Sequence, residues 1–208
     1  MKLTDKSVTE LLAAFQSSDP TPGGGSASAL AGAVGASLLA MVAGLPKSRA
    51  ASEEDIERLA AAGARCGELA AHLADLVDRD SESYELVVSA YRKPKGTDEE
   101  KAARSAAIQD AMRAAIAAPL DVMRSCAAAI EQGVVVAGMG NTNAASDVQV
   151  ALELLGAGLR GAKQNVDINL GSVKDPAYVE QVRRDEAEFE RGARHETTAA
   201  LQRLGATA

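Results

Sequence analysis

The chain has 208 residues, a formal net charge of −7 and only 2% aromatic residues, with no tryptophan. This length predicts a single domain, residues 1–208, and the scarcity of aromatic residues favours a helix-on-helix core of aliphatic side chains, alanine and glycine. The acidic balance argues against a protein that binds nucleic-acid phosphates. Cys66 and Cys126 are too few for a disulfide framework, so we expect buried thiols. The N-terminus carries no apolar signal region, so a cytoplasmic protein is the expectation.

The first predicted helix begins with a capping box between Ser7 and Glu10 and ends near Ser17. A loop with the sequence PTPGGG follows at residues 20–25. Its prolines restrict the backbone and its glycines free it, and Ser26 is placed to cap the next helix. Such a turn leaves backbone N–H groups exposed for an anionic or polar ligand group, although many such turns only reverse the chain. No P-loop lysine follows.

The next predicted helix, over residues 26–44, carries no charged residue. It is long enough to raise the question of a membrane span. Its alanines and glycines, however, form a surface that lets neighbouring helices approach closely. We therefore predict a central bundle helix or a subunit interface, and no membrane partner.

A third helix is predicted from Ser52 to about Tyr91, with an apolar seam at alternating spacings of four and three residues. Asp80 interrupts this seam. A buried carboxylate is unfavourable unless it is paired, so Asp80 has either a structural partner or a functional role. Tyr84 lies one turn further along the same face, where the carboxylate and the phenol could face one cavity.

The fourth helix is predicted to begin with a capping box between Thr97 and Glu100 and to end at Gly133. Pro119 lies inside it, and should kink the helix and free a backbone carbonyl one turn back. Lys95 lies just before its start, either in a solvated turn or in position to meet an anionic ligand group.

A second glycine-rich turn, over residues 138–143, is predicted to open a fifth helix from about Ala144 to Leu170. Asp147 and Asn165 share one face of this helix but lie about 27 Å apart at 1.5 Å per residue. They cannot both touch one small reacting centre. The last helix begins after Asp175 and ends near Leu204. Two separate surface histidines, His72 and His195, predict no metal site.

Three stretches together resemble the cyclodeaminase/cyclohydrolase family of folate one-carbon enzymes. They are PTPGGGSASALAGAVGASLLAMV at 20–42, YRKPKGTDEEKAAR at 91–104 and GNTNAASDVQVALELLGAGLRGAKQNVDINL at 140–170. The resemblance covers nearly the whole chain and is greatest to the methenyltetrahydrofolate cyclohydrolases. It implies an all-α, up-and-down bundle of long helices and a homodimer with a folate cleft near the dimer interface.

The implied activity is hydrolysis of 5,10-methenyltetrahydrofolate to 10-formyltetrahydrofolate, with the folate as substrate and no cofactor. Water must add to an amidinium carbon, which a buried carboxylate can assist as general base. Asp80 is the first candidate, with Tyr84 or Lys95 to orient water or pass a proton, and Asp147 is the second. The implied substrate-binding residues are Pro22, Gly23, Gly24, Gly25, Ser26, Asn141, Ser146 and Asn165, with Arg or Lys at the cleft rim for the glutamate tail.

Two alternatives stay open. The same pocket could run the cyclodeaminase reaction, in which ammonia leaves a formimidoyltetrahydrofolate. The chain could also be a non-enzymatic helical dimer or folate-binding scaffold. Asp80 and Asp147 on buried seams argue against a scaffold, which gains nothing obvious from them.

Overall fold

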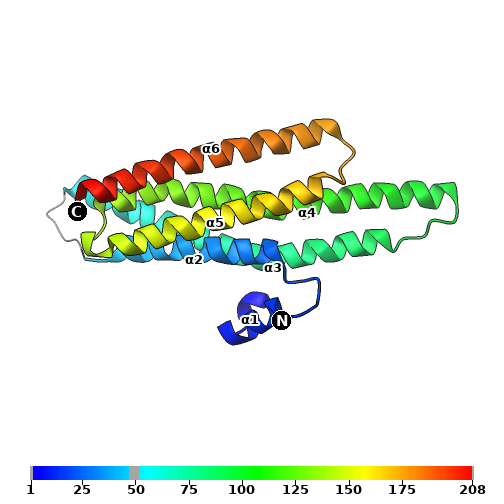
Figure 1. Ribbon diagram of the computed structural model, residues 1–208, viewed down its shortest axis with the longest axis horizontal. Helices are drawn as coiled ribbons and strands as arrows, with labels where there is room; N and C mark the ends of the chain where they lie inside the picture. The colour runs from blue at the N-terminus through cyan, green and yellow to red at the C-terminus, as the bar shows by residue number, and fades with distance from the viewer. Residues whose placement is uncertain (1, 47–51, 208) are drawn as a thin grey trace.

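The computed structural model describes residues 2–46 and 52–207, and within them it contains helices and no strand. The long helices lie lengthwise beside one another, and each runs opposite to the one before it (Figure 1). This confirms the predicted all-α up-and-down bundle. These helices are α2 (Gly24–Gly44), α3 (Glu53–Tyr91), α4 (Asp98–Met139), α5 (Ala145–Leu170) and α6 (Pro176–Thr207).

The charge-free helix α2 packs against α3, α4 and α5 on one side, while Val34 and Met41 on its other side are exposed. Ala29 and Ala36 on it are fully buried. The approach of α5 to α2 is so close that a Cβ on Gly158 would lie 2.8 Å from the Ser28 carbonyl oxygen. The small residues therefore let the helix backbones approach closely, as the sequence predicts.

By length and composition, α2 and α4 could each cross a membrane. In the bundle, 44% and 50% of their most apolar windows are buried inside the protein. Packing against other helices accounts for the buried part of this apolar character, while Val34 and Met41 on α2 are exposed. The absence of a membrane partner stays a prediction.

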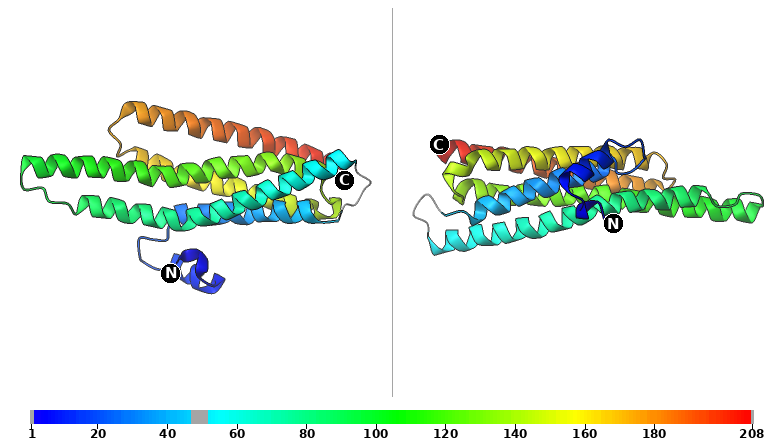
Figure 2. Two further views of the ribbon diagram at one scale, coloured as in Figure 1. Left: turned by 180° about the vertical axis from the view of Figure 1, so that it is seen from behind. Right: turned by 90° about the horizontal axis from the view of Figure 1, so that it is seen from below.

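The predicted seam of α3 forms the core up to Val77: Leu59, Cys66 and Leu73 are also at most 1% exposed. Beyond Asp80 the seam leaves the core, and Tyr84 is 38% exposed. The reason is that the ends of α3 and α4 project past the other helices (Figures 1 and 2). The seam therefore passes from core to cavity wall within one helix.

Two helix boundaries differ from the sequence prediction. Helix α4 continues to Met139 instead of ending at Gly133. Gly133 is buried, and a Cβ there would lie 3.0 Å from Leu152, so this glycine serves packing. Helix α2 begins at Gly24 with Gly23 as N-cap, so the prediction that Ser26 caps it is wrong. Ser26 lies inside the first turn, and its side chain bonds outside its own helix.

The other helix ends follow their predicted caps. Both capping boxes form, at Ser7 and at Thr97, and Asp175 accepts from the backbone of Ala177 and Tyr178. The first helix, α1 (Val8–Phe15), ends slightly before the predicted Ser17, and α6 runs slightly past the predicted Leu204. The fifth helix begins after a short 3₁₀ turn, η2 (Thr142–Ala144).

The N-terminal segment lies outside the bundle (Figure 1). Helix α1 buries none of its residues. Before it, the 3₁₀ turn η1 (Leu3–Asp5) is tied to the bundle by a buried carboxylate: Asp78 accepts from the Leu3 N–H at 2.5 Å and from the Thr4 hydroxyl at 2.8 Å.

The cysteines are buried and free, as predicted, and burial raises the pKa of both thiols to about 12. The histidines lie outside the core. The side chain of His195 is 80% exposed, and that of His72 is 41% exposed with Nε2 2.9 Å from an Asp121 oxygen. Among the described residues no three histidine, cysteine or acidic side chains are arranged to hold a metal ion.

Candidate functional site

A pocket of about 320 Å³ lies where the glycine loop meets α3, α4 and α5. It gathers residues from four separate parts of the chain, including several that the sequence analysis selects. The loop and the start of α2 supply Pro20, Thr21, Gly23, Gly24 and Gly25; α3 supplies Asp80, Ser83, Tyr84 and Val87; α4 and α5 supply Ala115, Asn165, Ile168 and Asn169.

The Asp80 carboxylate is held at the N-terminus of α2. Its Oδ2 accepts from the Ser26 backbone N–H at 2.9 Å, and the Ser26 hydroxyl lies 3.1 Å from the same oxygen. That hydroxyl also lies 2.9 Å from the Val77 carbonyl, and its single proton serves one of these acceptors at a time. In the described part of the chain both bonds to this carboxylate end on Oδ2, which leaves Oδ1 without a donor.

Gly25 is required by the same contact. A Cβ added at this position would overlap the Asp80 carboxylate, with Oδ1 as the nearest atom. Only a residue without a side chain lets the carboxylate lie against the first turn of α2. The helix dipole and the free N–H groups there favour a negative charge.

Two opposing effects set the ionisation of this carboxylate. Burial is the larger one and raises the pKa of Asp80, while the two contacts from Ser26 lower it. The raised pKa makes this aspartate more basic than an exposed one. A general base needs this property together with access to a cavity.

The opposite wall of the pocket is built on α5. Asn165 donates its side-chain N–H to the Gly161 carbonyl at 2.9 Å, which leaves its amide oxygen available to a ligand. One turn later, Asn169 donates to the Ala115 carbonyl at 3.0 Å. Pro119 has no N–H to donate to this carbonyl. The backbone carbonyl that the sequence predicts to lose its helical partner is therefore that of Ala115.

The glycine loop closes the pocket on the remaining side, with Thr21 and Pro22 half-buried and the peptide bond between them cis. Pro22 itself lies in the loop between two lining residues, Thr21 and Gly23. The predicted juxtaposition of Asp80, Tyr84, the glycine loop and Asn165 is therefore present in one chain.

Four of the predicted site residues lie elsewhere. Asn141, Ser146 and Asp147 lie at the other end of the bundle, where the Asn141 side chain donates to the Pro46 carbonyl at 2.7 Å. Lys95 lies in a second pocket beyond the end of α3. The roles suggested for these four residues stay predictions.

Several lining residues were not selected from the sequence. Thr21 and Ser83 carry no distinguishing signal, because their side chains become relevant only through helix packing, whereas Val87 continues the predicted α3 seam after Tyr84. Ala115 and Asn169 had a signal: Pro119 frees the carbonyl four residues before it, and Asn169 lies on the same helix face as Asn165.

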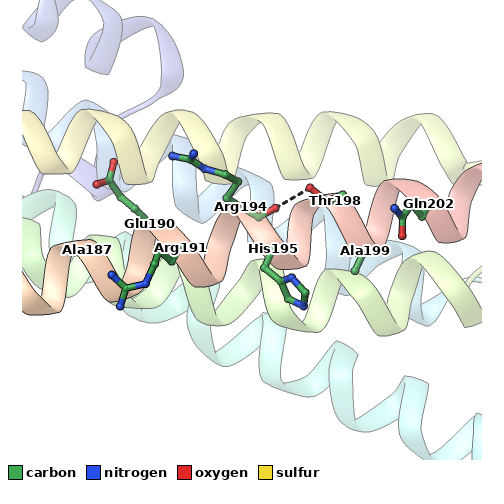
Figure 3. A pocket seen from close by; sticks show the side chains of 8 residues that line it. All are labelled: Ala187, Glu190, Arg191, Arg194, His195, Thr198, Ala199 and Gln202. Carbon is green, nitrogen blue, oxygen red and sulfur yellow. Dashed lines mark hydrogen bonds between the residues drawn. The ribbon is translucent and has the colours of Figure 1, made fainter.

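A larger pocket, of about 660 Å³, runs along α6, but it does not bring together residues from separate parts of the chain. All its lining residues come from this one helix, and their side chains point in different directions (Figure 3). Glu190, Arg191, Arg194 and His195 are among them. We regard this hollow as a surface groove and the smaller pocket as the candidate active site.

Comparison with known proteins identifies the family of this chain. The sequence profile of the family described as Formiminotransferase-cyclodeaminase matches residues 7–188. The chain belongs to this family. The match includes every residue that lines the candidate site.

The relatives include two kinds of enzyme. The chain is 38% identical over 180 residues to a methenyltetrahydrofolate cyclohydrolase from Methylorubrum extorquens, covering 85% of each protein. It is 35% identical over 189 residues to the formimidoyltransferase-cyclodeaminase of Sus scrofa, covering 89% of this chain but 34% of that enzyme. The chain thus spans about a third of the pig enzyme and most of the bacterial one.

A solved structure shares the fold along nearly the whole chain. It is the crystal structure of a formiminotetrahydrofolate cyclodeaminase from Thermotoga maritima, with a TM-score of 0.82 and 27% identity over 97% of both chains. The all-α bundle is therefore the fold of a folate-processing relative.

Proposed function

We propose that this protein is a methenyltetrahydrofolate cyclohydrolase, which hydrolyses 5,10-methenyltetrahydrofolate to 10-formyltetrahydrofolate. The observation that carries the proposal is the Asp80 carboxylate, partly buried at the pocket, with a raised pKa and one oxygen free of donors. The 38% identity to the bacterial cyclohydrolase, over most of both chains, supports the choice of reaction.

Asp80 has two roles in this mechanism, one toward the charge of the substrate and one toward the proton of the attacking water. As a carboxylate it stabilises the amidinium cation of the substrate and accepts a proton from the water that adds to the central carbon. The carbon–nitrogen bond to one nitrogen then breaks and leaves a formyl group on the other. The remaining hydroxyl proton passes to the leaving nitrogen, and Asp80 releases its proton to solvent.

The other pocket residues position the folate. The backbone N–H groups of Gly23, Gly24 and Gly25, at the start of α2, have no partner within the helix and can hold its polar atoms, and the free amide oxygen of Asn165 can accept from ring N–H groups. Tyr84, one turn from Asp80 and exposed to the pocket, is placed to orient the water or pass the proton to the leaving nitrogen.

The test is the loss of absorbance of 5,10-methenyltetrahydrofolate with purified protein, measured against uncatalysed hydrolysis. Ammonia release from 5-formimidoyltetrahydrofolate is measured in parallel. Fast loss of absorbance without ammonia release is the expected result. No acceleration over the buffer control by a folded protein would refute the proposal, and the absence of ammonia release as well would favour the scaffold alternative.

The second candidate function is the cyclodeaminase reaction, in which ammonia leaves the formimidoyl carbon. It is favoured by the Thermotoga maritima structure, whose protein is named for that activity. Both reactions need a carboxylate near a one-carbon group between two nitrogens, so Asp80 fits either. Ammonia release in the parallel assay distinguishes them.

We further propose a homodimer with no cofactor or metal, in the cytoplasm. Val34 and Met41 on α2 are 45% and 44% exposed, and Val150 on α5 is 51% exposed, which leaves an apolar stripe for a second copy. Val34 lies near the middle of α2. A two-fold axis perpendicular to α2 at this point would place the α2 of a second copy antiparallel to it. Asn141 of one copy would then lie toward the pocket of the other.

A further inference from the structure

The Ser26 side chain is enclosed behind the wall of the candidate active site. The family resemblance implies that Ser26 touches the substrate, but its side chain is fully buried. Gly25, its neighbour in the chain, lines the pocket, and Ser26 itself does not. Any effect of the Ser26 hydroxyl on the reaction therefore passes through the groups that this hydroxyl contacts.

Three oxygen atoms lie within hydrogen-bond distance of the Ser26 hydroxyl. They are the Val77 carbonyl oxygen at 2.9 Å, the Asp80 Oδ2 atom at 3.1 Å and the Ser81 hydroxyl at 3.3 Å. A backbone carbonyl and an ionised carboxylate can only accept, and a serine hydroxyl has one proton to donate. The hydroxyl can therefore satisfy Asp80 or Val77, and rotation of its O–H bond exchanges the two arrangements.

The charge on Asp80 determines which acceptor is favoured. A hydrogen bond to an ionised carboxylate is roughly twice as strong as one between neutral groups, so the hydroxyl donates to Oδ2 while Asp80 is ionised. The Ser26 backbone N–H donates to the same oxygen at 2.9 Å. Once Oδ1 has taken up a proton, the carboxyl is neutral, and the shorter contact to the Val77 carbonyl becomes the better one.

The other titratable groups around Asp80 leave this effect in place. Helix α2 carries no charged residue, and the residues that α4 and α5 contribute to the pocket wall are uncharged: Ala115, Asn165, Ile168 and Asn169. On α3, Tyr84 is the titratable group that shares the wall with Asp80, and the buried Asp78 takes its hydrogen bonds from the N-terminal segment. Within the described residues, Ser26 is thus the side-chain donor that responds to the charge of Asp80.

We propose that Ser26 is a positioning residue for the general base: its hydroxyl donates to Oδ2 while Asp80 is ionised and turns to the Val77 carbonyl when Asp80 takes up the proton of the attacking water. The assignment of this step to the reaction rests on the proposed function, whereas the switch itself is a property of the free protein. The proton goes to Oδ1, and no bond within the Ser26 side chain breaks. The buried hydroxyl keeps an acceptor in both states of Asp80, so neither state leaves it unsatisfied.

The switch can be observed without turnover by nuclear magnetic resonance. In protein with carbonyl-labelled valine and nitrogen-labelled aspartate, a carbonyl–amide correlation arises wherever valine precedes aspartate, and the sequence has two such pairs, Val77–Asp78 and Val166–Asp167. The Val77 carbonyl resonance should shift on acidification with the midpoint of the Asp80 carboxyl, which is assigned by its absence from Asp80→Asn. Val166, on α5, is the internal control and should not follow this midpoint.

Ser26→Ala removes the hydroxyl and keeps the backbone N–H. It should raise the proton affinity of Asp80 about tenfold, because a strong bond to the charged form is lost and only a weaker bond to the neutral form is lost with it. The acid-dependent shift at Val77 should disappear. The acid limb of kcat/KM should move to higher pH by the same factor, so the loss of kcat/KM should be greater in acid than at alkaline pH.

Ser28→Ala is the matched control on the same helix. Ser28 is also buried, but its hydroxyl donates to the Gly24 carbonyl at 2.7 Å within α2. This variant should leave the proton affinity of Asp80 and the acid limb unchanged. Thermal unfolding verifies that both variants are folded, and the Val77 measurement on the wild-type protein needs neither of them.

Two results would overturn the switch: a Val77 carbonyl that does not respond at the midpoint of Asp80, or an Asp80 midpoint that is the same in Ser26→Ala as in the wild type. An equal loss of kcat/KM at every pH in Ser26→Ala would assign this serine a structural role instead. A switch observed in a wild-type protein that lacks cyclohydrolase turnover would refute the proposed reaction alone.

Discussion

The Asn169 side chain supplies the hydrogen bond that Pro119 cannot give to the Ala115 carbonyl, at 3.0 Å. The bond joins α5 to α4 at the wall of the candidate active site. A proline inside a long helix is thereby compensated by a residue on another helix.

Replacing Asn169 by leucine should therefore destabilise the fold by about 1–3 kcal/mol, because the half-buried carbonyl loses its donor. Urea unfolding followed by circular dichroism measures the change. In a Pro119→Ala background the helix regains its own N–H donor, so the same substitution should then cost clearly less. Equal costs in both backgrounds would show that the two residues are not coupled.

Gly25→Ala should destabilise the protein and reduce turnover, because the new Cβ overlaps the Asp80 carboxylate. The destabilisation should be about 1–3 kcal/mol, as for other overpacked sites. Gly24→Ala is the matched control for stability, since its Cβ would lie 3.6 Å from Asn165, an ordinary contact. Combining Gly25→Ala with Asp80→Ala should restore stability but not activity. Thermal unfolding and the absorbance assay give the two readouts.

Asp80→Asn should lower kcat about 10²- to 10⁴-fold, the range for loss of a general base. The fold should not lose stability at neutral pH. Burial raises the pKa of Asp80, so its contribution to stability is full below the unfolded-state pKa and is lost as pH rises through the folded-state pKa. A variant that unfolds more easily at pH 7 but keeps its turnover would assign Asp80 a structural role.

The pH profile of the wild-type enzyme should also show the raised pKa of Asp80. The activity of a general base requires its ionised form, so kcat/KM should fall on the acid side through a pKa above the ordinary aspartate value. This limb should be absent from the residual activity of Asp80→Asn. An acid limb shared by both proteins would place the titrating group elsewhere.

Glu186→Gln should stabilise the protein at neutral pH by about 1 kcal/mol. Glu186 is only 3% exposed, its Oε1 has no partner in the described structure, and burial, followed by the nearby Asp167, raises its pKa. Its contribution to stability is thus lost as pH rises through the folded-state pKa, and the gain from glutamine should shrink in acid. Glu188→Gln, at an exposed position on the same helix, should leave the melting temperature unchanged.

The proposed homodimer can be tested by mixing two inactive variants, Asp80→Asn and Asn141→Ala. If Asn141 of one copy serves the pocket of the other, each mixed dimer contains one intact site. About half of the dimers are mixed after full subunit exchange of an equal mixture, so activity should return to about a quarter of wild type. Size-exclusion chromatography with light scattering determines the assembly. A monomer, or a fully active Asn141→Ala, would exclude this arrangement.

Periodicity and caps predicted the helix order and most helix starts, because these features are local. Ser26 and Gly133 show the limit. Each has the sequence position of a helix boundary, but the Asp80 carboxylate and the Leu152 side chain, both far away in the chain, determine its role.

The candidate site was predictable where a polar residue interrupts an apolar seam, as at Asp80 and Asn165. It was not predictable where a residue lines the pocket only through packing, as Ser83 does. The family resemblance assigned Asn141, Ser146 and Asp147 to the same ligand as Asp80. Within one chain, however, these three residues lie at the opposite end of the bundle from Asp80. A family resemblance indicates which residues are functional, but it does not give the distances between them in the folded chain.

The attachment of η1 by Asp78 bears on how the protein is produced. Asp78 lies two positions before Asp80 on α3 and takes its hydrogen bonds from Leu3 and Thr4, close to the start of the chain. An affinity tag or trimmed N-terminus that displaces these residues would leave the buried Asp78 carboxylate without these donors, on the helix that also carries Asp80. A C-terminal tag, at the other end of the chain after α6, should leave these hydrogen bonds in place.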